Sequence, residues 1–206
     1  MSPRKSDSRQ RMIESTVELL RRHGASATSV DRVLAHSQAP RGSVYHHFPG
    51  GRAQLVEEAV RHVGTSVSGL IEEAASQGDP RGAVDDFLEM WRQRLLGSDF
   101  QAGCSLAAVA VEVNEEAPQL ARSAGEFFAL WRETLGGLFV RHGLTPERGR
   151  RLATLVVTSV EGAVLVCRAE RSVAPLDDTA AEIRDLLANA FAEVSGPADP
   201  PSANPR

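Results

Sequence analysis

The sequence predicts an all-α protein of about nine helices. Between residues 49 and 196 proline occurs only five times, and the gaps between these prolines are long enough for a helix and its connection. Apolar residues recur at the spacing of a single helical face, most clearly across residues 183–194. No segment alternates apolar and polar residues over the length of a strand. We therefore expect no parallel-sheet cofactor fold.

Caps and glycines set the expected boundaries of these helices. Asp79-Pro80 and Thr145-Pro146 each offer a capping oxygen followed by a proline at the first helical position. Gly24, Gly78 and Gly143 each follow a periodic segment, where a helix C-terminus favours a residue that tolerates positive φ. The expected helices are 7–23, 29–36, 40–47, 52–77, 80–96, 104–115, 118–142, 146–170 and 177–195. The tail, 196–206, is rich in proline and is expected to be disordered.

Length and composition limit the class of protein. The chain has 206 residues, of which 42% are hydrophobic and 24% charged, values typical of a globular protein with one domain or with a small and a larger one. Its longest apolar runs are far shorter than a membrane span, and its start lacks the apolar segment of a secretory signal. Its two cysteines lie far apart and give no disulfide framework. We expect a soluble, cytoplasmic protein.

The charge is distributed unevenly along the chain. Residues 1–55 contain nine Lys+Arg and four Asp+Glu, a balance of +5, whereas residues 56–206 contain 14 and 23, a balance of −9. The first segment also holds four of the six histidines. A basic end on an acidic body suggests that only this end meets a polyanion such as nucleic acid. Chance variation in surface charge is the alternative.

Three short helices are expected within the first 48 residues. Residues 28–31, Thr-Ser-Val-Asp, have the form of a capping box, with the hydroxyl of Thr28 at the N-cap and a carboxylate three residues later. The helix that follows must end before Pro40, which cannot continue a helix but can open a new one. The segment therefore predicts a helix, a four-residue turn and a second helix. In DNA-binding helix-turn-helix motifs, that second helix enters the major groove.

The side chains of the second helix suit contact with double-stranded DNA. Arg41 offers a two-pronged donor that matches guanine, Gly42 lets the backbone approach closely, and Ser43 can bond to a base or a phosphate. Tyr45, the histidines and Arg52 supply donors for phosphates, which fix register without reading sequence. The predicted DNA-binding residues are Thr28, Ser29, Gln38, Pro40, Arg41, Gly42, Ser43, Tyr45, His46, His47 and Arg52. A helix pair without a DNA role is the alternative.

These residues also resemble a known family. The run APRGSVYHHFPGG at 39–51, followed by Arg52, Gln54 and Leu55, resembles the recognition-helix signature of the TetR family of transcriptional regulators. The double glycine after Pro49 and GCSLAAVAVEV at 103–113 further resemble the LmrA/YxaF-like branch, which contains regulators of lincomycin-type drug resistance. The sequence departs from the family pattern at Gln38, where glycine is common, and at Pro40, where a serine cap is common.

The resemblance implies a division of labour along the chain. Residues 1–50 would form the helix-turn-helix DNA-binding domain, and residues 51–195 a helical domain that binds an effector and dimerises. It also implies a homodimer in which the last two long helices of each subunit form a four-helix bundle, and the apolar faces of 146–170 and 177–195 agree with this. The predicted dimer residues are Leu155, Ser159, Gly162, Ala163, Ile183, Leu187 and Phe191. The same stripes could instead close the core of a single chain.

The resemblance also implies a pocket for a small effector inside the body. Aromatic and sulfur-bearing side chains cluster there at helical spacing, and large apolar groups with few polar ones are typical of drug-sized ligand sites. The predicted ligand residues are Phe87, Met90, Trp91, Phe100, Cys104, Phe127, Phe128, Trp131, Glu161, Val164 and Cys167. Core packing is the alternative for each apolar residue. Solvation or a dimer contact is the alternative for Glu161 and Ser159.

Other chemistries find little support in the residues. Cys104 and Cys167 could form a redox pair if they met in space, but they lack a CxxC arrangement. His46 and His47 are adjacent, so they diverge on a helix, and we expect no metal site. The chain has no glycine-rich phosphate loop after a strand, no HExxH and no GxSxG, and we expect no catalytic residues and no cofactor.

The sequence thus predicts a DNA-binding transcriptional regulator. We expect a homodimeric repressor that binds a palindromic operator and leaves it when a hydrophobic small molecule binds. The alternative is a dimeric helical protein that binds a small molecule or a partner without operator specificity. A salt-sensitive shift of duplex DNA separates the two.

Overall fold

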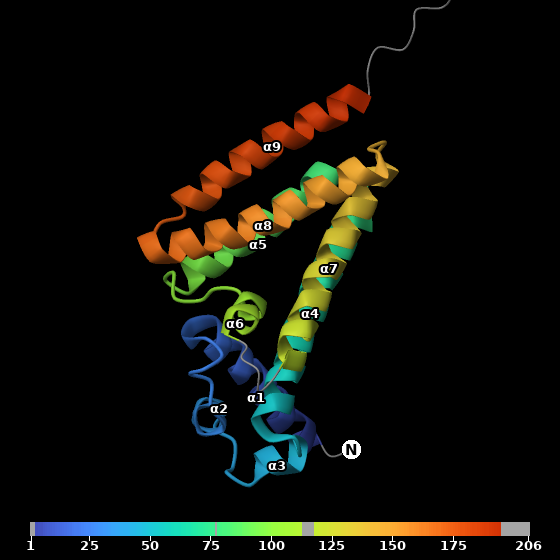
Figure 1. Cartoon of the computed structure of the whole chain (residues 1–206). Helices are drawn as coiled ribbons and strands as arrows, with labels where there is room; N and C mark the ends of the chain where they lie inside the picture. The colour runs from blue at the N-terminus through green and yellow to red at the C-terminus, as the bar shows by residue number, and fades with distance from the viewer. Residues whose placement is uncertain (1–2, 77, 113–117, 195–206) are drawn as a thin grey trace, which may run out of the picture.

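The computed structural model describes residues 3–76, 78–112 and 118–194, and within these ranges all regular structure is helical (Figure 1). Its nine helices are α1 (Pro3–His23), α2 (Val30–Ser37), α3 (Ser43–His47), α4 (Gly51–Ser76), α5 (Pro80–Gly97), α6 (Ser105–Glu112), α7 (Pro118–Arg141), α8 (Pro146–Glu170) and α9 (Ala174–Val194). The predicted all-α fold is confirmed. The predicted tail, 196–206, lies outside the described residues.

The helix boundaries follow the capping chemistry of the sequence. Asp79 caps α5 by accepting a hydrogen bond from the N–H of Arg81 (2.9 Å), and Thr145 caps α8 by accepting one from the N–H of Arg148 (3.3 Å). Pro80 and Pro146 open these helices, as expected. At the helix ends, the predicted glycines at 24, 78 and 143 have φ values of 82°, 76° and 102°.

Three helices begin more than one residue from the prediction, and the first of them is α1, which begins at Pro3 and not at residue 7. The second helix begins at Ser43 and not at Pro40, because the N–H and the hydroxyl of Ser43 both donate to the carbonyl of Pro40 (2.9 and 2.6 Å) and close a turn there. The last helix begins three residues early, at Ala174, whose N–H is capped by the hydroxyl of Ser172 (3.1 Å). α6 is described only to Glu112, and the predicted residues 113–115 lie outside the described ranges.

The helices form two ends that share one core. In Figure 1 α1, α2 and α3 occupy the lower end, α4 and α7 run side by side upward from it, and α8 and α9 cross the upper end. A single hydrophobic cluster runs from Met12 in α1 to Phe191 in α9. Phe48 and Leu55, on either side of the predicted domain boundary at residue 50, both belong to this cluster. The lower end is therefore attached to the body by packing as well as by the chain.

α4 and α7 approach each other closely because of one glycine. The ring of Phe127 in α7 lies where a Cβ on Gly64 of α4 would stand. One turn further along α7, the indole N–H of Trp131 donates to the carbonyl of Gly64 (3.4 Å). Gly64 thus sets the distance between α4, which follows α3 in the chain, and α7, which leads to the upper end.

Candidate functional site

The α2–α3 segment has the geometry of a helix-turn-helix. Gln38 ends α2 in the left-handed conformation, with a φ of 54°, so a glutamine occupies the turn position where the family pattern commonly has glycine. Val44 and Phe48 are both fully buried and attach α3 to the core by its apolar side. The opposite side of α3 faces outward at the lower end of the molecule (Figure 1).

Several predicted DNA-binding residues lie together on this outward side. Arg41, Gly42, Tyr45 and His46 are all exposed, and the phenol ring of Tyr45 is 66% exposed although aromatic side chains are usually covered. Within the described part of the chain, no hydrogen bond or ion pair engages the side chain of Arg41. The guanidinium of Arg41 and the exposed phenol of Tyr45 can therefore contact a partner. Three further predicted residues on the exposed surface are Ser29, Gln38 and Pro40.

The other four predicted DNA-binding residues, Thr28, Ser43, His47 and Arg52, are buried, half-buried or bonded within the chain. Thr28 is buried, and its hydroxyl donates to the carbonyl of Gly24 (2.7 Å), so it faces inward. The N-cap of α2 is Ser29, which accepts from the N–H of Arg32, and the predicted cap at Thr28 is wrong by one residue. The hydroxyl of Ser43 donates to the carbonyl of Pro40, and the half-buried ring of His47 packs edge-on against Phe48 (6.4 Å between centroids).

Arg52 serves the fold of the lower end. It donates from Nε to the carbonyl of Thr28 (2.8 Å) and from Nη2 to the carbonyl of Ala25. Its side chain therefore joins the start of α4 to the α1–α2 loop instead of extending to a phosphate. Both carbonyls belong to the loop between α1 and α2, and that of Ala25 also accepts from the N–H of Thr28 (3.1 Å).

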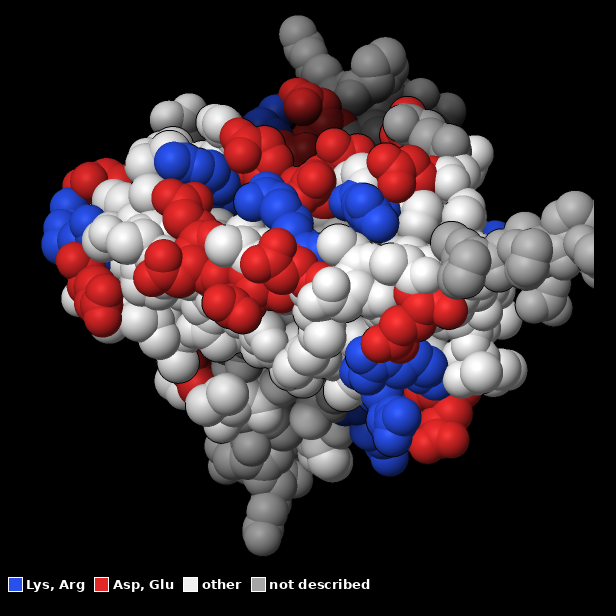
Figure 2. All heavy atoms as spheres, turned by 90° about the horizontal axis from the view of Figure 1, so that it is seen from above, with Lys and Arg blue, Asp and Glu red and all other residues white. Residues whose placement is uncertain are grey.

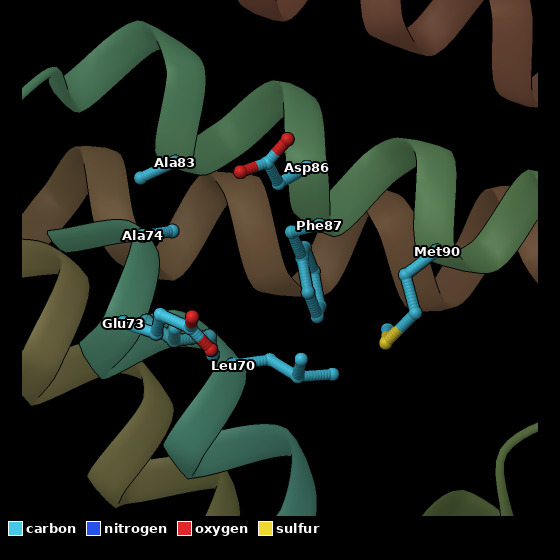
Figure 3. A pocket seen from close by; sticks show the side chains of 8 residues that line it. Leu70, Glu73, Ala74, Ala83, Asp86, Phe87 and Met90 are labelled. Carbon is cyan, nitrogen blue, oxygen red and sulfur yellow. The ribbon is translucent and has the colours of Figure 1, made fainter. Parts of the chain in front are cut away.

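Of the predicted ligand residues, Phe87 and Met90 line a cavity between α4 and α5, here called the α4–α5 cavity. It has a volume of about 320 Å³. Figure 3 shows both side chains extending from α5 toward Leu70 of α4. Glu73 and Asp86 add two carboxylates to an otherwise apolar lining. Size and lining fit a small apolar ligand.

A different group of predicted ligand residues lies at a second cavity, here called the junction cavity, between α1, α6 and α8. It has a volume of about 440 Å³, and Cys104, Glu161 and Val164 line it. The Cys104 thiol donates a hydrogen bond to the carboxylate of Glu161. Burial raises the pKa of Glu161 to about 7, against the opposing effects of Cys104 and of Arg94, and burial also raises the pKa of Cys104.

The remaining predicted ligand residues belong to the core or its edge. Trp91, Trp131 and Cys167 are buried, and Trp131 stacks edge-on with Phe87 (6.4 Å) and Phe128 (5.3 Å). Half-buried residues packed against the core are Phe100, Phe127 and Phe128. The structure thus divides the predicted single pocket into two cavities with core aromatics between. Both cysteines are free.

The sequence missed the arginines of the junction cavity. Arg21 of α1 and Arg168 of α8 line it, and Arg94 of α5 lies close enough to lower the pKa of Glu161. Burial, followed by repulsion from Arg21, lowers the pKa of Arg94 to about 10. The one signal in the sequence was the spacing of Glu161 and Arg168, seven residues apart and hence on one face of α8.

The predicted dimer residues fall on two different faces. Ala163, Ile183, Leu187 and Phe191 are buried inside the single chain, so their stripes close its own core, which was the stated alternative. Leu155 and Gly162 are exposed, and Ser159 is half-buried beside them. With Thr158, Val166 and Ala169, which are also exposed, they form a stripe along α8, here called the α8 stripe.

α8 is also the one helix, among the described residues, that is long and apolar enough to cross a membrane, and 44% of its most apolar window is buried in the chain. The upper surface of the molecule, on the side of α9, carries both acidic and basic side chains (Figure 2). Arg184 pairs with Asp85 (2.7 Å) and Arg92 with Asp177 (3.5 Å) between α5 and α9. This charged face lies at the opposite end from α3.

The geometry defines a class of protein: a helix-turn-helix unit, exposed at one end, joined to a helical body with internal cavities. Residues 12–59 match the family model for bacterial regulatory proteins of the tetR family, and residues 80–182 match the C-terminal domain of LmrA/YxaF-like transcriptional regulators. The chain is 42% identical over 185 residues to Rv0196 of Mycobacterium tuberculosis, named an HTH-type transcriptional regulator, covering 87% of this chain and 93% of that one. The regulator LmrA of Bacillus subtilis is 25% identical over 182 residues, covering 88% and 97%.

Solved structures agree in fold. A TetR regulatory protein from Rhodobacter sphaeroides superposes with a TM-score of 0.77 at 22% identity, over 85% of this chain and 96% of that one. A TetR regulator from Legionella pneumophila gives 0.78 at 18% identity, over 85% and 95%. The chain therefore belongs to the TetR family of transcriptional regulators, with an LmrA/YxaF-like C-terminal domain.

Proposed function

We propose that this regulator is a homodimeric repressor of a palindromic operator, released by a hydrophobic small molecule held in the α4–α5 cavity. In this proposal residues 1–50 read DNA and residues 51–195 dimerise and bind the effector, in the cytoplasm. The observation that carries the proposal is the outward side of α3, where Arg41, Tyr45 and His46 are exposed on a helix anchored by Val44 and Phe48. Such a helix can enter a major groove while its buried side holds it in place.

The α8 stripe supports the dimer. Leu155 is 45% exposed and Val166 is 42% exposed, and Gly162 lies between them with no atom near the position of a Cβ. An apolar stripe with a gap of this kind lets a second helix approach closely. In this proposal, pairing through α8 leaves the two copies of α3 on one side of the dimer. Their separation must then match one DNA turn, ~34–36 Å.

α4 supports the coupling between effector and DNA. Its C-terminal half lines the α4–α5 cavity at Leu70 and Glu73. Its N-terminal half packs against the DNA-reading end through Leu55 and through an ion pair between Glu58 and Arg9. A ligand that shifts α4 therefore changes the position of α3. A coupling of ~1–3 kcal/mol lowers DNA affinity by about 5- to 150-fold.

The test of DNA reading uses duplexes from the regions upstream of the protein's own and neighbouring coding sequences. Fluorescence anisotropy at several salt concentrations should show tight, salt-sensitive binding to a duplex with an inverted repeat. Arg41→Ala should cost ~1–3 kcal/mol and relax base preference at one step of each half-site, whereas Tyr45→Phe should weaken binding to all sequences alike. Arg150→Ala, on the exposed surface of α8, is the control. Wild-type affinity in both α3 variants would contradict the proposal and favour a helical protein without operator specificity.

The test of the effector site uses 1-aminoanthracene, a neutral aromatic fluorophore. Met90→Trp fills part of the α4–α5 cavity and should abolish the fluorescence increase on binding. Leu96→Trp places the same side chain at an exposed position of the same helix and should leave binding intact. Equal loss in both variants would assign the fluorescence to another site.

A further inference from the structure

The junction cavity contains buried polar atoms that the chain itself leaves unsatisfied. Within the described residues, Oε1 of Glu161 and Nε of Arg168 are buried without a hydrogen-bond partner, and both side chains line the cavity. Nη1 of the neighbouring Arg94 is in the same condition. Unpaired buried polar atoms are rare because they lose their water without a substitute. One donor on Arg168 and one acceptor on Glu161 at the cavity wall, with Arg94 close to Glu161 on α5, indicate a site for a polar ligand group.

The charge around the cavity is positive. The groups that face Glu161 or line the cavity are Arg21, Arg22 and His23 of α1, Arg94 of α5, Cys104 and Glu112 of α6, and Arg168 of α8. The charges of two of these groups are already paired or solvated by the chain: Arg22 forms an ion pair with Glu18, and Glu112 accepts a hydrogen bond from the N–H of Ser26 (2.7 Å). Arg21, Arg94 and Arg168 remain, and the carboxylates near them are Glu161 and, beside Arg21, Glu18. A cavity with this excess of guanidinium groups attracts an anion.

The rest of the wall is apolar. Leu20 of α1, Ala107 and Ala108 of α6, and Val164 of α8 line the cavity beside the charged groups. A free inorganic anion would gain nothing from this surface, whereas a hydrocarbon body would be removed from water by it. The lining therefore fits a molecule with one anionic end and one apolar end.

From these contacts we propose that the junction cavity binds a small amphipathic organic anion, a carboxylate carried on an apolar body, with its carboxylate at Arg168 and its apolar part against α1, α6 and α8. This site is separate from the α4–α5 cavity, where Glu73 and Asp86 would repel an anion. Glu161 lies beside the carboxylate and, when it has taken up a proton from solvent, donates that proton in a hydrogen bond to the carboxylate.

The site also touches the DNA-reading end directly. Arg21 contributes both its side chain to the cavity and its carbonyl to the N–H of Gly103 (3.0 Å), just before α6. Arg22 donates to the side chain of Gln101 (2.9 Å), and Arg168 donates to the carbonyl of the same Gln101 (3.0 Å). The loop 101–104 is thus held between α1 and α8 by groups that border the cavity. A bound anion that attracts Arg168 and Arg21 changes this loop, and with it the orientation of α1.

The first experiment measures binding to the full-length protein without DNA. Octanoate, octylammonium and 1-octanol share one hydrocarbon chain and differ only in charge. By isothermal titration calorimetry, octanoate should bind at least about tenfold more tightly than either of the other two, because a hydrogen-bonded charge pair in a partly buried site contributes that much. Tighter binding of octylammonium or of octanol would overturn the assignment of an anion.

Substitutions test whether the anion binds in the junction cavity. Arg168→Gln keeps a donor at the wall but removes the charge, and should weaken octanoate binding about tenfold. Arg150→Gln, elsewhere on α8, and Met90→Trp, in the α4–α5 cavity, should leave octanoate affinity unchanged. Far-ultraviolet circular dichroism and the melting temperature check that each variant is folded. Unchanged octanoate affinity in a folded Arg168→Gln variant would overturn the proposed site.

The pH dependence is an independent test that requires no change of fold. A carboxylate placed beside Glu161 favours the protonated form of Glu161, whose pKa is about 7 in the free protein. If the anion binds the protonated form, its affinity falls about tenfold between pH 6 and pH 8. Glu161→Gln, which is neutral and of the same shape, should bind octanoate equally at both pH values. A fall that persists in Glu161→Gln would overturn the role of this residue.

The consequence for DNA rests on the proposed function, and its test is separate. Octanoate should weaken binding of the operator duplex in wild-type protein and not in Arg168→Gln. If octanoate binds the protein while DNA affinity stays constant, the regulatory part is wrong and the site stands. If the wild-type protein binds no duplex at all, the proposed function is wrong, and the calorimetry without DNA still decides whether the anion site exists.

Discussion

Gly64 offers the sharpest test of how the DNA-reading end is attached to the body. In Gly64→Ala the new methyl group would overlap the ring of Phe127, so the ring or one of the two helices must shift. Overpacking of a core costs about 1–3 kcal/mol, whereas replacing glycine by alanine in a helix gains about 1 kcal/mol. Gly64→Ala should therefore change the free energy of unfolding by between about 0 and −2 kcal/mol.

Gly69→Ala is the matched control. Gly69 lies on the same helix, is exposed, and has no atom near the position of a Cβ, so only the helix preference acts there. The difference between the two variants removes that preference and should be about 1–3 kcal/mol, or roughly 2–12 °C in melting temperature for a chain of this size. Urea unfolding followed by tryptophan fluorescence measures it.

Phe127→Leu completes a double-mutant cycle. If the overlap is real, Gly64→Ala should cost less in a Phe127→Leu background, because the smaller side chain leaves room for the methyl group. Equal stability of Gly64→Ala and Gly69→Ala, or strict additivity in the cycle, would refute the argument that this glycine sets the distance between α4 and α7.

Three further predictions follow from other parts of the chain. Burial holds the pKa of Glu161 at about 7, above its ordinary value of 4.5, so between these values the native protein keeps a proton that the unfolded chain releases. The free energy of unfolding should therefore fall by up to ~1.4 kcal/mol per pH unit between pH 5 and pH 7. Glu161→Gln should remove this slope in urea titrations. Gln38→Gly should stabilise the protein by about 0.5–1 kcal/mol, because glycine adopts the left-handed turn at φ 54° without strain, whereas Ala35→Gly inside α2 should destabilise it by about as much in the same thermal unfolding assay. Leu155→Glu with Val166→Glu should convert a dimer to a monomer in size-exclusion chromatography with light scattering, while Leu96→Glu on α5 should not; an unchanged mass would exclude the α8 stripe as the dimer interface.

The sequence allowed the helices to be placed because helix boundaries depend on local chemistry. Prolines and capping side chains at 79–80 and 145–146 act on their own turn, so their effect is visible in a few adjacent residues. The same reasoning failed by three residues at Pro40. There Ser43 bonds back to the Pro40 carbonyl, and a turn competes with the first turn of a helix made of the same residues.

The site residues divide in the same way. The exposed side of α3 could be predicted because Val44 and Phe48 define its buried side at helical spacing. Arg52 could not, since its hydrogen bonds go to Ala25 and Thr28, more than twenty residues away in the chain. Likewise, an apolar stripe on α8 or α9 shows that a face is covered but not what covers it. Ile183 and Leu187 turned out to be covered by the chain itself.

The two cavities are lined by different helices that connect the α1–α3 end to the rest of the chain. The α4–α5 cavity is lined by α4, which packs on α1 and continues directly from α3, and it carries carboxylates. The junction cavity is lined by α1 itself and by the α6 side of the body, and it carries guanidinium groups. Because the linings have opposite charge, one ligand cannot favour both sites. The two proposals together predict that an apolar neutral molecule acts through α4 and an amphipathic anion through α1, and that Met90→Trp and Arg168→Gln separate the effects of the two ligands on DNA affinity.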